Sequence, residues 1–130
     1  VPVTKEGKIL MVRQWRNAVD SYTLEIPAGA RNFAEENGKD CVSRELEEET
    51  GYRSENIEWL ITIHSWPPFT NEQVEIFVAK DLIPTKQNFD EEESIELEEY
   101  TIEELKEKIF KGEIRDSKTV AGLLAYALHG

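Results

Sequence analysis

A run of glutamates in the middle of the chain, RELEEETGY at residues 44–52, is the feature that most limits how this sequence can fold. Asn37 can cap a helix over about residues 38–50, and Gly51 can close it. Glutamates three or four positions apart on such a helix repel one another by roughly 0.2–0.5 kcal/mol per pair. The chain must therefore either expose these carboxylates to water or hold a cation against them.

Three of the glutamates fall on the same side of the predicted helix. On a wheel of about 100° per residue, Glu45, Glu48 and Glu49 share an arc of roughly 100°, which borders the apolar positions Val42 and Leu46. Acidic helices are common on protein surfaces, so a solvated face accounts for the charges themselves. It does not explain why they gather beside the apolar positions. A divalent cation would relieve their repulsion, and Mg²⁺ prefers oxygen ligands.

Strand and helix signals alternate along the rest of the chain. Apolar runs separated by turn residues predict a hairpin and three further strands, at residues 1–15, 22–30, 57–66 and 72–82. A capping box at Thr101 and Glu104 predicts a helix, and a last helix starts near Asp116 or Ser117. No repeat or linker interrupts this order, so we predict one α/β domain over residues 1–130.

The composition excludes several classes of function. A formal net charge of -12 argues against nucleic acid as a partner, because such binding depends on Lys and Arg. Cys41 is the only cysteine, which excludes an internal disulfide and makes a reducing cytoplasm the expected compartment. No apolar run approaches the roughly 18 residues that span a bilayer, so we expect no membrane partner. The chain begins at Val1 rather than Met, and we expect an upstream N-terminal segment.

Gly29, Glu36 and the run from Arg44 to Tyr52 resemble the Nudix box, the signature of Nudix hydrolases. That pattern is Gly, five residues, Glu, seven residues, then Arg-Glu-aliphatic-x-Glu-Glu-x-Gly-aliphatic. Seven residues separate Glu36 from Arg44, whereas counting forward from Gly29 gives Glu35, so this loop is one residue longer than the pattern. We assign the early glutamate to Glu36, because a helix fixes spacing more rigidly than a loop. Arg44 is then expected to form a structural ion pair with Glu36.

Three other segments resemble the ADP-ribose pyrophosphatase branch of that family: VRQWR at 12–16, LEIPAG at 24–29 and PPFTNE at 67–72. Pro68 stands where the branch has glycine. The resemblance implies a Nudix-type α/β/α sandwich with a mixed β-sheet between helices. It also implies a homodimer that hydrolyses the pyrophosphate bond of ADP-ribose or a related nucleoside diphosphate sugar. The products would be a nucleoside monophosphate and a sugar phosphate.

The resemblance further implies a metal site and a general base. A metal ion would neutralise the diphosphate and orient the attacking water, and Mg²⁺ is expected, with Mn²⁺ as the alternative. The implied ligands are the carboxylates of Glu45, Glu48 and Glu49 and the main-chain carbonyl of Ala28. Glu93 is the expected base, and its neighbour Glu92 is the alternative. The catalytic residues would thus be Glu93 and Glu48.

Substrate contacts are expected from one arginine and from the PPFTNE loop. Arg13 and Arg16 are three apart on a strand and lie on opposite faces, so only one of them can face an anionic substrate. Arg16 matches the family's pattern better, and a surface ion pair is the competing interpretation. In the loop, Pro67 and Glu72 match positions of the branch.

Three alternatives remain open at this point. The chemistry could be retained with another nucleoside diphosphate-linked substrate. The chain could also be a regulatory Nudix domain that binds nucleotides without cleaving them, although such a domain would be expected to lose carboxylates of the box. An inert acidic interaction domain is the third, and it leaves the placement of Glu45, Glu48 and Glu49 unexplained.

Overall fold

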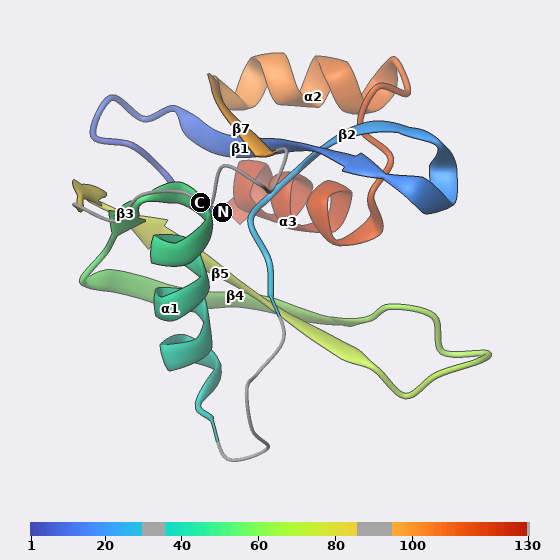
Figure 1. The fold of residues 1–130 in the computed structure, drawn as a ribbon, viewed down its shortest axis with the longest axis horizontal. Helices are drawn as coiled ribbons and strands as arrows, with labels where there is room; N and C mark the ends of the chain where they lie inside the picture. The colour runs from blue at the N-terminus through green and yellow to red at the C-terminus, as the bar shows by residue number, and fades with distance from the viewer. Residues whose placement is uncertain (30–35, 86–94, 130) are drawn as a thin grey trace.

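The computed structural model describes residues 1–29, 36–85 and 95–129 (Figure 1). Its three helices are α1 (Gly38–Thr50), α2 (Ile102–Phe110) and α3 (Ser117–His129). A short 3-10 helix, η1 (Asn17–Val19), also occurs. The strands are β1 (Ile9–Arg16), β2 (Ser21–Glu25), β3 (Tyr52–Arg53), β4 (Asn56–His64), β5 (Gln73–Lys80), β6 (Ile83–Pro84) and β7 (Ile95–Tyr100).

Antiparallel pairs build the sheets. β1 lies between β2 and β7, β4 pairs with β5, and β3 pairs with β6. Side chains alternate across a strand, so β1 and β5 each contribute to two cores. Ile9 and Met11 of β1 and Ile76 and Val78 of β5 join the core that also contains residues of α2 and α3.

The second core lies on the opposite side of the same strands. Leu10 of β1 and Phe77 and Ala79 of β5 pack there with Leu46 of α1. Helices therefore cover both faces of the strands, with α1 on one side and α2 and α3 on the other (Figure 1). This arrangement confirms the predicted α/β/α sandwich.

The first residues of the chain join the separate strand pairs. Val3 N–H donates to Ala79 O at 2.7 Å, and Leu10 N–H donates to Pro2 O at 3.0 Å. This segment therefore lies between β5 and β1, with a parallel bridge from Pro2 to Ala79. The predicted hairpin within residues 1–15 is thus only partly right: Val3 does bridge to Ile9, but its segment also pairs with a strand far along the chain.

Local signals set the ends of α1. The Asn37 side chain accepts from Lys39 N–H at 2.7 Å at the start of the helix. Gly51 ends it in the left-handed conformation at φ 73°, which suits glycine because it has no Cβ. The predicted helix over about 38–50 is confirmed. The predicted strand over 22–30 is shorter, because β2 ends at Glu25 and Pro27 has no N–H to continue a ladder.

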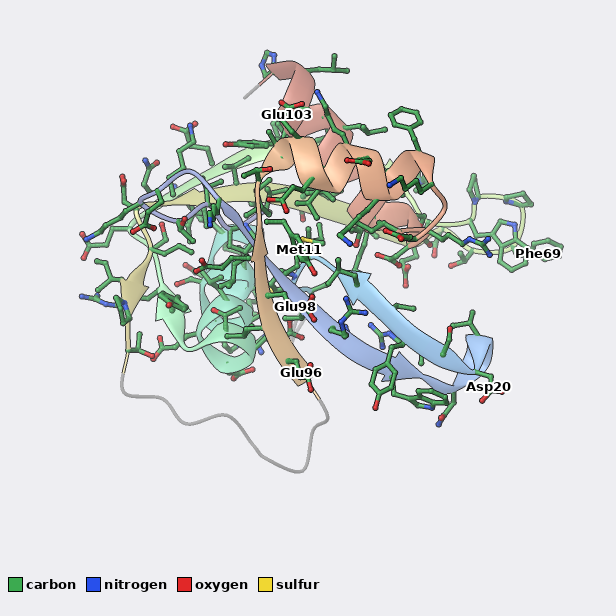
Figure 2. The ribbon with its side chains drawn as sticks, turned by 90° about the horizontal axis from the view of Figure 1, so that it is seen from above. Met11, Asp20, Phe69, Glu96, Glu98 and Glu103 are labelled. Atoms are coloured by element: carbon green, nitrogen blue, oxygen red, sulfur yellow. The ribbon has the colours of Figure 1, made fainter. Side chains whose placement is uncertain are left out.

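Two hairpins project from the same end of the molecule. Figure 2 shows Asp20 in the β1–β2 connection and Phe69 in the β4–β5 connection at that end. Trp66 and Phe69 make an edge-to-face contact in the second connection, with ring centroids 4.7 Å apart. In the described part of the chain no helix is both long and apolar enough to cross a membrane.

Candidate functional site

A cavity of about 690 Å³ lies between the segment that follows β2, the apolar side of α1 and strand β5. Its lining includes Ala28, Gly29, Glu45 and Glu72, together with the cationic side chains of Arg16 and Lys118. The cavity is therefore lined by a carboxylate of the acidic helix and by two cations. Such a surface can receive an anion and a cation side by side.

The segment 26–29 lies directly against the acidic side of α1. Ala28 N–H donates to Glu49 Oε2 at 3.0 Å. A Cβ built on Gly29 would lie 2.0 Å from Glu45 Cδ, so only a residue without a side chain allows this approach. The main chain at Ala28 and the carboxylates of Glu45 and Glu49 are thus neighbours, although they come from different parts of the sequence.

Arg44 connects the other carboxylates of the box. Its NH2 donates to Glu36 Oε1 at 3.0 Å and its NH1 donates to Glu45 Oε1 at 2.6 Å. Arg44 NH1 also lies 3.5 Å from Glu48 Oε2. The hydrogen bonding of Arg44 to the Glu36 carboxylate is the main cause of a raised pKa of Arg44. The expected ion pair between Arg44 and Glu36 is confirmed.

The carboxylates on α1 supply the ligand chemistry that a hard divalent cation requires, because Mg²⁺ and Mn²⁺ bind carboxylate and carbonyl oxygens. Across residues 1–29, 36–85 and 95–129 no group of three or more Asp, Glu, His or Cys side chains converges as a metal cage. Arg44 balances Glu45 and Glu48 here, and the Ala28 N–H balances Glu49. An ion bound by these carboxylates would compete with Arg44 for Glu45 and Glu48.

The basic part of the wall is built on a buried carboxylate. Arg16 donates to both oxygens of Glu25, at 2.8 and 2.9 Å, and Lys118 Nζ donates to Glu25 Oε1 at 2.7 Å. Thr23 Oγ1 donates to Glu25 Oε2 at 2.5 Å. Burial alone would raise the pKa of Glu25, but the hydrogen bonds from Arg16, Lys118 and Thr23 outweigh it and lower the pKa to about 2. Glu25 is therefore ionised at neutral pH.

Arg13 and Arg16 lie on different sides of β1, as the strand geometry predicts. Arg13 forms an ion pair with Glu98 of β7, whereas Arg16 lines the cavity. The hydrogen bonds that Arg16 donates to Glu25 are the main cause of a raised pKa of Arg16, and the charge of Glu49 contributes to it. The cation on β1 and the acidic side of α1 are thus close enough to interact.

The remaining predicted site residues differ in where they lie. Glu72 lines the cavity, and its carbonyl accepts from Ser65 N–H at 3.2 Å across the base of the β4–β5 connection. Pro67 is exposed in that connection and is not among the described residues that line the cavity. Nor are Glu48 and Glu49, although both lie beside Glu45 on α1. Glu93, like Glu92, lies outside the described residues.

Sequence reasoning missed Glu25 and Lys118. Glu25 stands inside LEIPAG, where it was not assigned a role of its own. Lys118 is 93 positions from Glu25 and lies in the first turn of α3. The only local signal for its placement is the helix start at DSKT, where Asp116 Oδ2 accepts from Thr119 N–H at 3.2 Å.

Comparisons with known proteins agree on one family. The model of the NUDIX domain family matches residues 1–123. The chain is 42% identical to a methanol dehydrogenase activator of Bacillus methanolicus and 38% identical to an ADP-ribose pyrophosphatase of Bacillus subtilis, over 92% and 97% of its length. It spans 65% and 66% of those two proteins, slightly under two thirds.

More distant relatives extend the range of substrates and supply the fold. A GDP-mannose pyrophosphatase of Cronobacter sakazakii is 30% identical over 97% of this chain and 70% of its own length. The crystal structure of an ADP compounds hydrolase superposes with a TM-score of 0.87 at 21% identity, and it covers 98% of this chain and 68% of that one. This likeness supports the α/β/α architecture described above.

Proposed function

Because this chain belongs to the NUDIX domain family, with a match over residues 1–123, we propose that it hydrolyses the diphosphate bond of ADP-ribose or a related nucleoside diphosphate sugar. The observation that carries the proposal is the cavity lining, in which Glu45 of α1 and the cations Arg16 and Lys118 occur together. A diphosphate bound to a metal ion needs both kinds of contact. The products are a nucleoside monophosphate and a sugar phosphate.

Glu45, Glu48 and Glu49, with the carbonyl of Ala28, are the residues proposed to hold Mg²⁺ or Mn²⁺. The bound ion would neutralise diphosphate charge and activate water. Gly29 lets the main chain approach Glu45, so that a carbonyl oxygen and a carboxylate can serve one ion. Arg44 keeps the carboxylates in place from the side, through its bonds to Glu36 and Glu45.

Other residues would bind substrate and move the proton. Arg16 is proposed to donate to a phosphate oxygen, and Glu72 and Pro67 to contact the remainder of the substrate from the β4–β5 connection. Glu93 is proposed as the general base that accepts the proton of the attacking water, with Glu92 as the alternative. Glu48 would contribute to catalysis as one of the ion's ligands.

The test is turnover of ADP-ribose and of GDP-mannose, with Mg²⁺, with Mn²⁺ and with a chelator, measured as released phosphomonoester. We expect turnover only with metal, and loss of at least about a hundredfold in Glu49→Gln, because the ligands of a catalytic ion carry several kcal/mol of transition-state stabilisation. Glu47→Gln is the matched control, since it removes a charge from the same helix at a position outside the proposed ligand set. No turnover of either sugar with metal would contradict the proposal.

GDP-mannose or another nucleoside diphosphate-linked compound is the second candidate substrate. The relative that supports it is the GDP-mannose pyrophosphatase, at 30% identity. The ratio of kcat/KM for the two sugars, measured on the same preparation, decides between them, because specificity is the ratio of these constants.

A regulatory role is supported by a different relative. The methanol dehydrogenase activator is 42% identical to this chain. A regulatory Nudix domain would bind ADP-ribose without cleaving it, and an activator would change the activity of methanol dehydrogenase when the two proteins are mixed. Binding of ADP-ribose without cleavage is the outcome that separates this role from that of a hydrolase.

We also propose that residues 1–130 form one Nudix domain and that the protein is a homodimer. Trp15 and Tyr22 flank the β1–β2 connection, Trp66 and Phe69 lie in the β4–β5 connection, and all four aromatic side chains are exposed. Burial of such side chains is a strong driving force for association. Light scattering after size exclusion would give the mass directly, and a monomer at micromolar concentration would contradict the dimer.

A further inference from the structure

Glu25 stands behind the cavity wall rather than in it. Its side chain is 3% exposed and is absent from the described lining, whereas its partners Arg16 and Lys118 both reach the cavity. We propose that Glu25 is a positioning residue that holds Arg16 and Lys118 as a fixed pair of cations for the diphosphate of the substrate. The inference rests on the proposed function, because it assigns these cations to the same substrate.

The hydrogen bonds to Glu25 leave donors on both cations. Arg16 uses Nε and NH2 for Glu25, which are two of the five N–H groups of a guanidinium. Lys118 Nζ donates to Glu25 and to Asp116 Oδ2, at 2.7 and 2.8 Å, which are two of its three N–H groups. One carboxylate thus fixes the direction of both side chains without using all of their donors.

The two cations lie nearer the cavity than the two carboxylates that bind them. Arg16 is 48% exposed and Lys118 17%, and both are part of the lining, whereas Glu25 and Asp116 are not among the described lining residues. Asp116 is itself held by Thr119, whose Oγ1 donates to Asp116 Oδ2 at 2.6 Å. At this part of the wall an anion would therefore meet Arg16 and Lys118 before Glu25 and Asp116, while Glu45, Glu72 and Glu75 line other parts of the cavity.

Two nitrogens that bond one carboxylate oxygen lie close together. Arg16 NH2 and Lys118 Nζ share Glu25 Oε1, at 2.9 and 2.7 Å. Such a pair matches the neighbouring non-bridging oxygens of a diphosphate better than it matches a single neutral group, because each cation can bond one oxygen. Without the shared carboxylate the two cations would repel each other, and Arg16 could turn toward solvent.

A purely structural role for Glu25 is the competing explanation, since the same contacts tie β2 to α3. These roles of Glu25, and a third in which it supplies only charge, predict different changes in anion affinity and in melting temperature. If Glu25 supplied only negative charge, its neutralisation would make the cavity more positive and tighten anion binding. If it is only a structural bridge, its loss would lower the melting temperature without a specific effect on binding. A positioning role predicts weaker binding in a variant that is folded at the assay temperature.

The experiment measures binding without turnover. ADP-ribose and inorganic pyrophosphate are titrated by calorimetry into the wild type and Glu25→Gln in the presence of a chelator. We expect Kd for both probes to rise about tenfold or more in Glu25→Gln, because removing one partner of a buried charge pair is costly. Glu25→Asp, which retains the charge, should recover part of the affinity.

The matched control is Glu98→Gln, which breaks another bidentate pair to β1, between Arg13 and Glu98. Glu98 lies along β7, as Figure 2 shows, and is not among the described residues that line the cavity. Its Kd for both probes should stay within about twofold of the wild type, the usual range for sites remote from a ligand.

A second variant keeps the test decisive if Glu25→Gln does not fold. Lys118→Gln should also weaken binding of pyrophosphate, and Glu25→Gln combined with Lys118→Gln should weaken it by less than the product of the single effects, since one acts through the other. Unchanged or tighter binding in Glu25→Gln or in Lys118→Gln would overturn the inference. So would the absence of saturable binding of either probe to the wild type.

The outcome is separable from that of the proposed function. A wild type that binds ADP-ribose with an affinity that depends on Glu25, but does not cleave it with Mg²⁺, would contradict the hydrolase and leave the cation pair standing. A wild type that cleaves it, with unchanged KM in Glu25→Gln, would contradict the cation pair alone. If both hold, KM rises in Glu25→Gln by a larger factor than kcat falls.

Discussion

At the scale of single residues, the site depends on one position where no side chain fits. A Cβ on Gly29 would lie 2.0, 2.3 and 2.5 Å from three atoms of the Glu45 side chain. Real Cβ atoms do not come so near, so Glu45 or the segment 26–29 would have to shift. Glycine is therefore favoured here by its neighbour and not by its own backbone angle, because a larger residue would displace the flexible Glu45 carboxylate.

Gly29→Ala should for this reason impair activity more than stability. The added methyl group displaces the Glu45 carboxylate, and a shift of a catalytic group by about 1 Å can cost about a hundredfold in rate. The expected result is a large fall in kcat for ADP-ribose with a melting temperature close to that of the wild type. Gly112→Ala is a useful contrast: Gly112 has φ 79°, so alanine there is strained, but it lies after α2 and should lower stability while leaving kcat unchanged. Normal kcat in Gly29→Ala would contradict the proposed role of Glu45.

At the scale of elements, Glu25 joins β2 to the start of α3. Lys118 bonds the carboxylate from α3, and Thr119 Oγ1 accepts from Ile26 N–H at 3.1 Å just after β2 ends. The two elements are far apart in sequence, so this contact exists only when β2 and α3 have packed together. The ion pairs of Glu25 should also make the free energy of unfolding depend on pH.

The pKa of Glu25 sets the direction of that dependence. Its folded value of about 2 lies below the ordinary value of 4.5, so its ionisation stabilises the fold above about pH 5, and this contribution is lost as the pH falls toward 2. The contribution is at most about 3 kcal/mol. In urea unfolding, the gap in free energy between wild type and Glu25→Gln should therefore be smaller at pH 3 than at pH 6.

Glu103→Gln is the comparison for this measurement. Glu103 is 74% exposed on α2, where it pairs with Lys106, so its removal should change the free energy of unfolding by well under about 1 kcal/mol at either pH. A gap for Glu25→Gln that stays constant from pH 6 to pH 3 would show that its ion pairs do not stabilise the fold.

The helices could largely be predicted from the sequence, because the signals that set their ends are local. The side chain of Asn37 and the backbone freedom of Gly51 fix the ends of α1, and Thr101 with Glu104 forms the complete capping box at the start of α2. Each signal acts within one helical turn, so the sequence carries it explicitly. The pairing of the first residues with β5 depends on contacts across the whole chain, and it was not predicted.

The candidate site likewise contains contacts that local sequence could predict and contacts that it could not. Arg44 and Glu36 are both close to one helix, and the resemblance of this segment to the Nudix box was enough to predict their ion pair. Glu25 and Lys118 are brought together only when β2 and α3 pack, and neither residue has a local pattern that indicates the other. Spacing also put Glu45, Glu48 and Glu49 on one arc, but it could not show that Arg44 bonds two of them in this structure.

At the scale of the whole molecule, the net charge of -12 opposes any anionic substrate. The field of the protein repels a diphosphate at long range, and the Debye length of about 8 Å at physiological salt confines that repulsion to the vicinity of the surface. The cation pair and a bound metal ion must therefore act at short range. A divalent cation also has a general attraction to such a protein, so a specific site must be distinguished from it.

Thermal unfolding makes this distinction. A ligand that binds the folded state at 100 times its Kd stabilises it by about 2.7 kcal/mol, which for a domain of this size shifts the melting temperature by on the order of 10 °C. We expect Mg²⁺ to produce such a shift in the wild type and a chelator to reverse it. NaCl at equal ionic strength should produce only a small shift, because it screens all carboxylates without bridging Glu45, Glu48 and Glu49. The double variant Glu45→Gln, Glu49→Gln should lose most of the response to Mg²⁺ while retaining the response to NaCl. Equal shifts with the two salts, or an undiminished Mg²⁺ response in the double variant, would mean that the ion interacts with the overall charge of the protein and not with the carboxylates of α1.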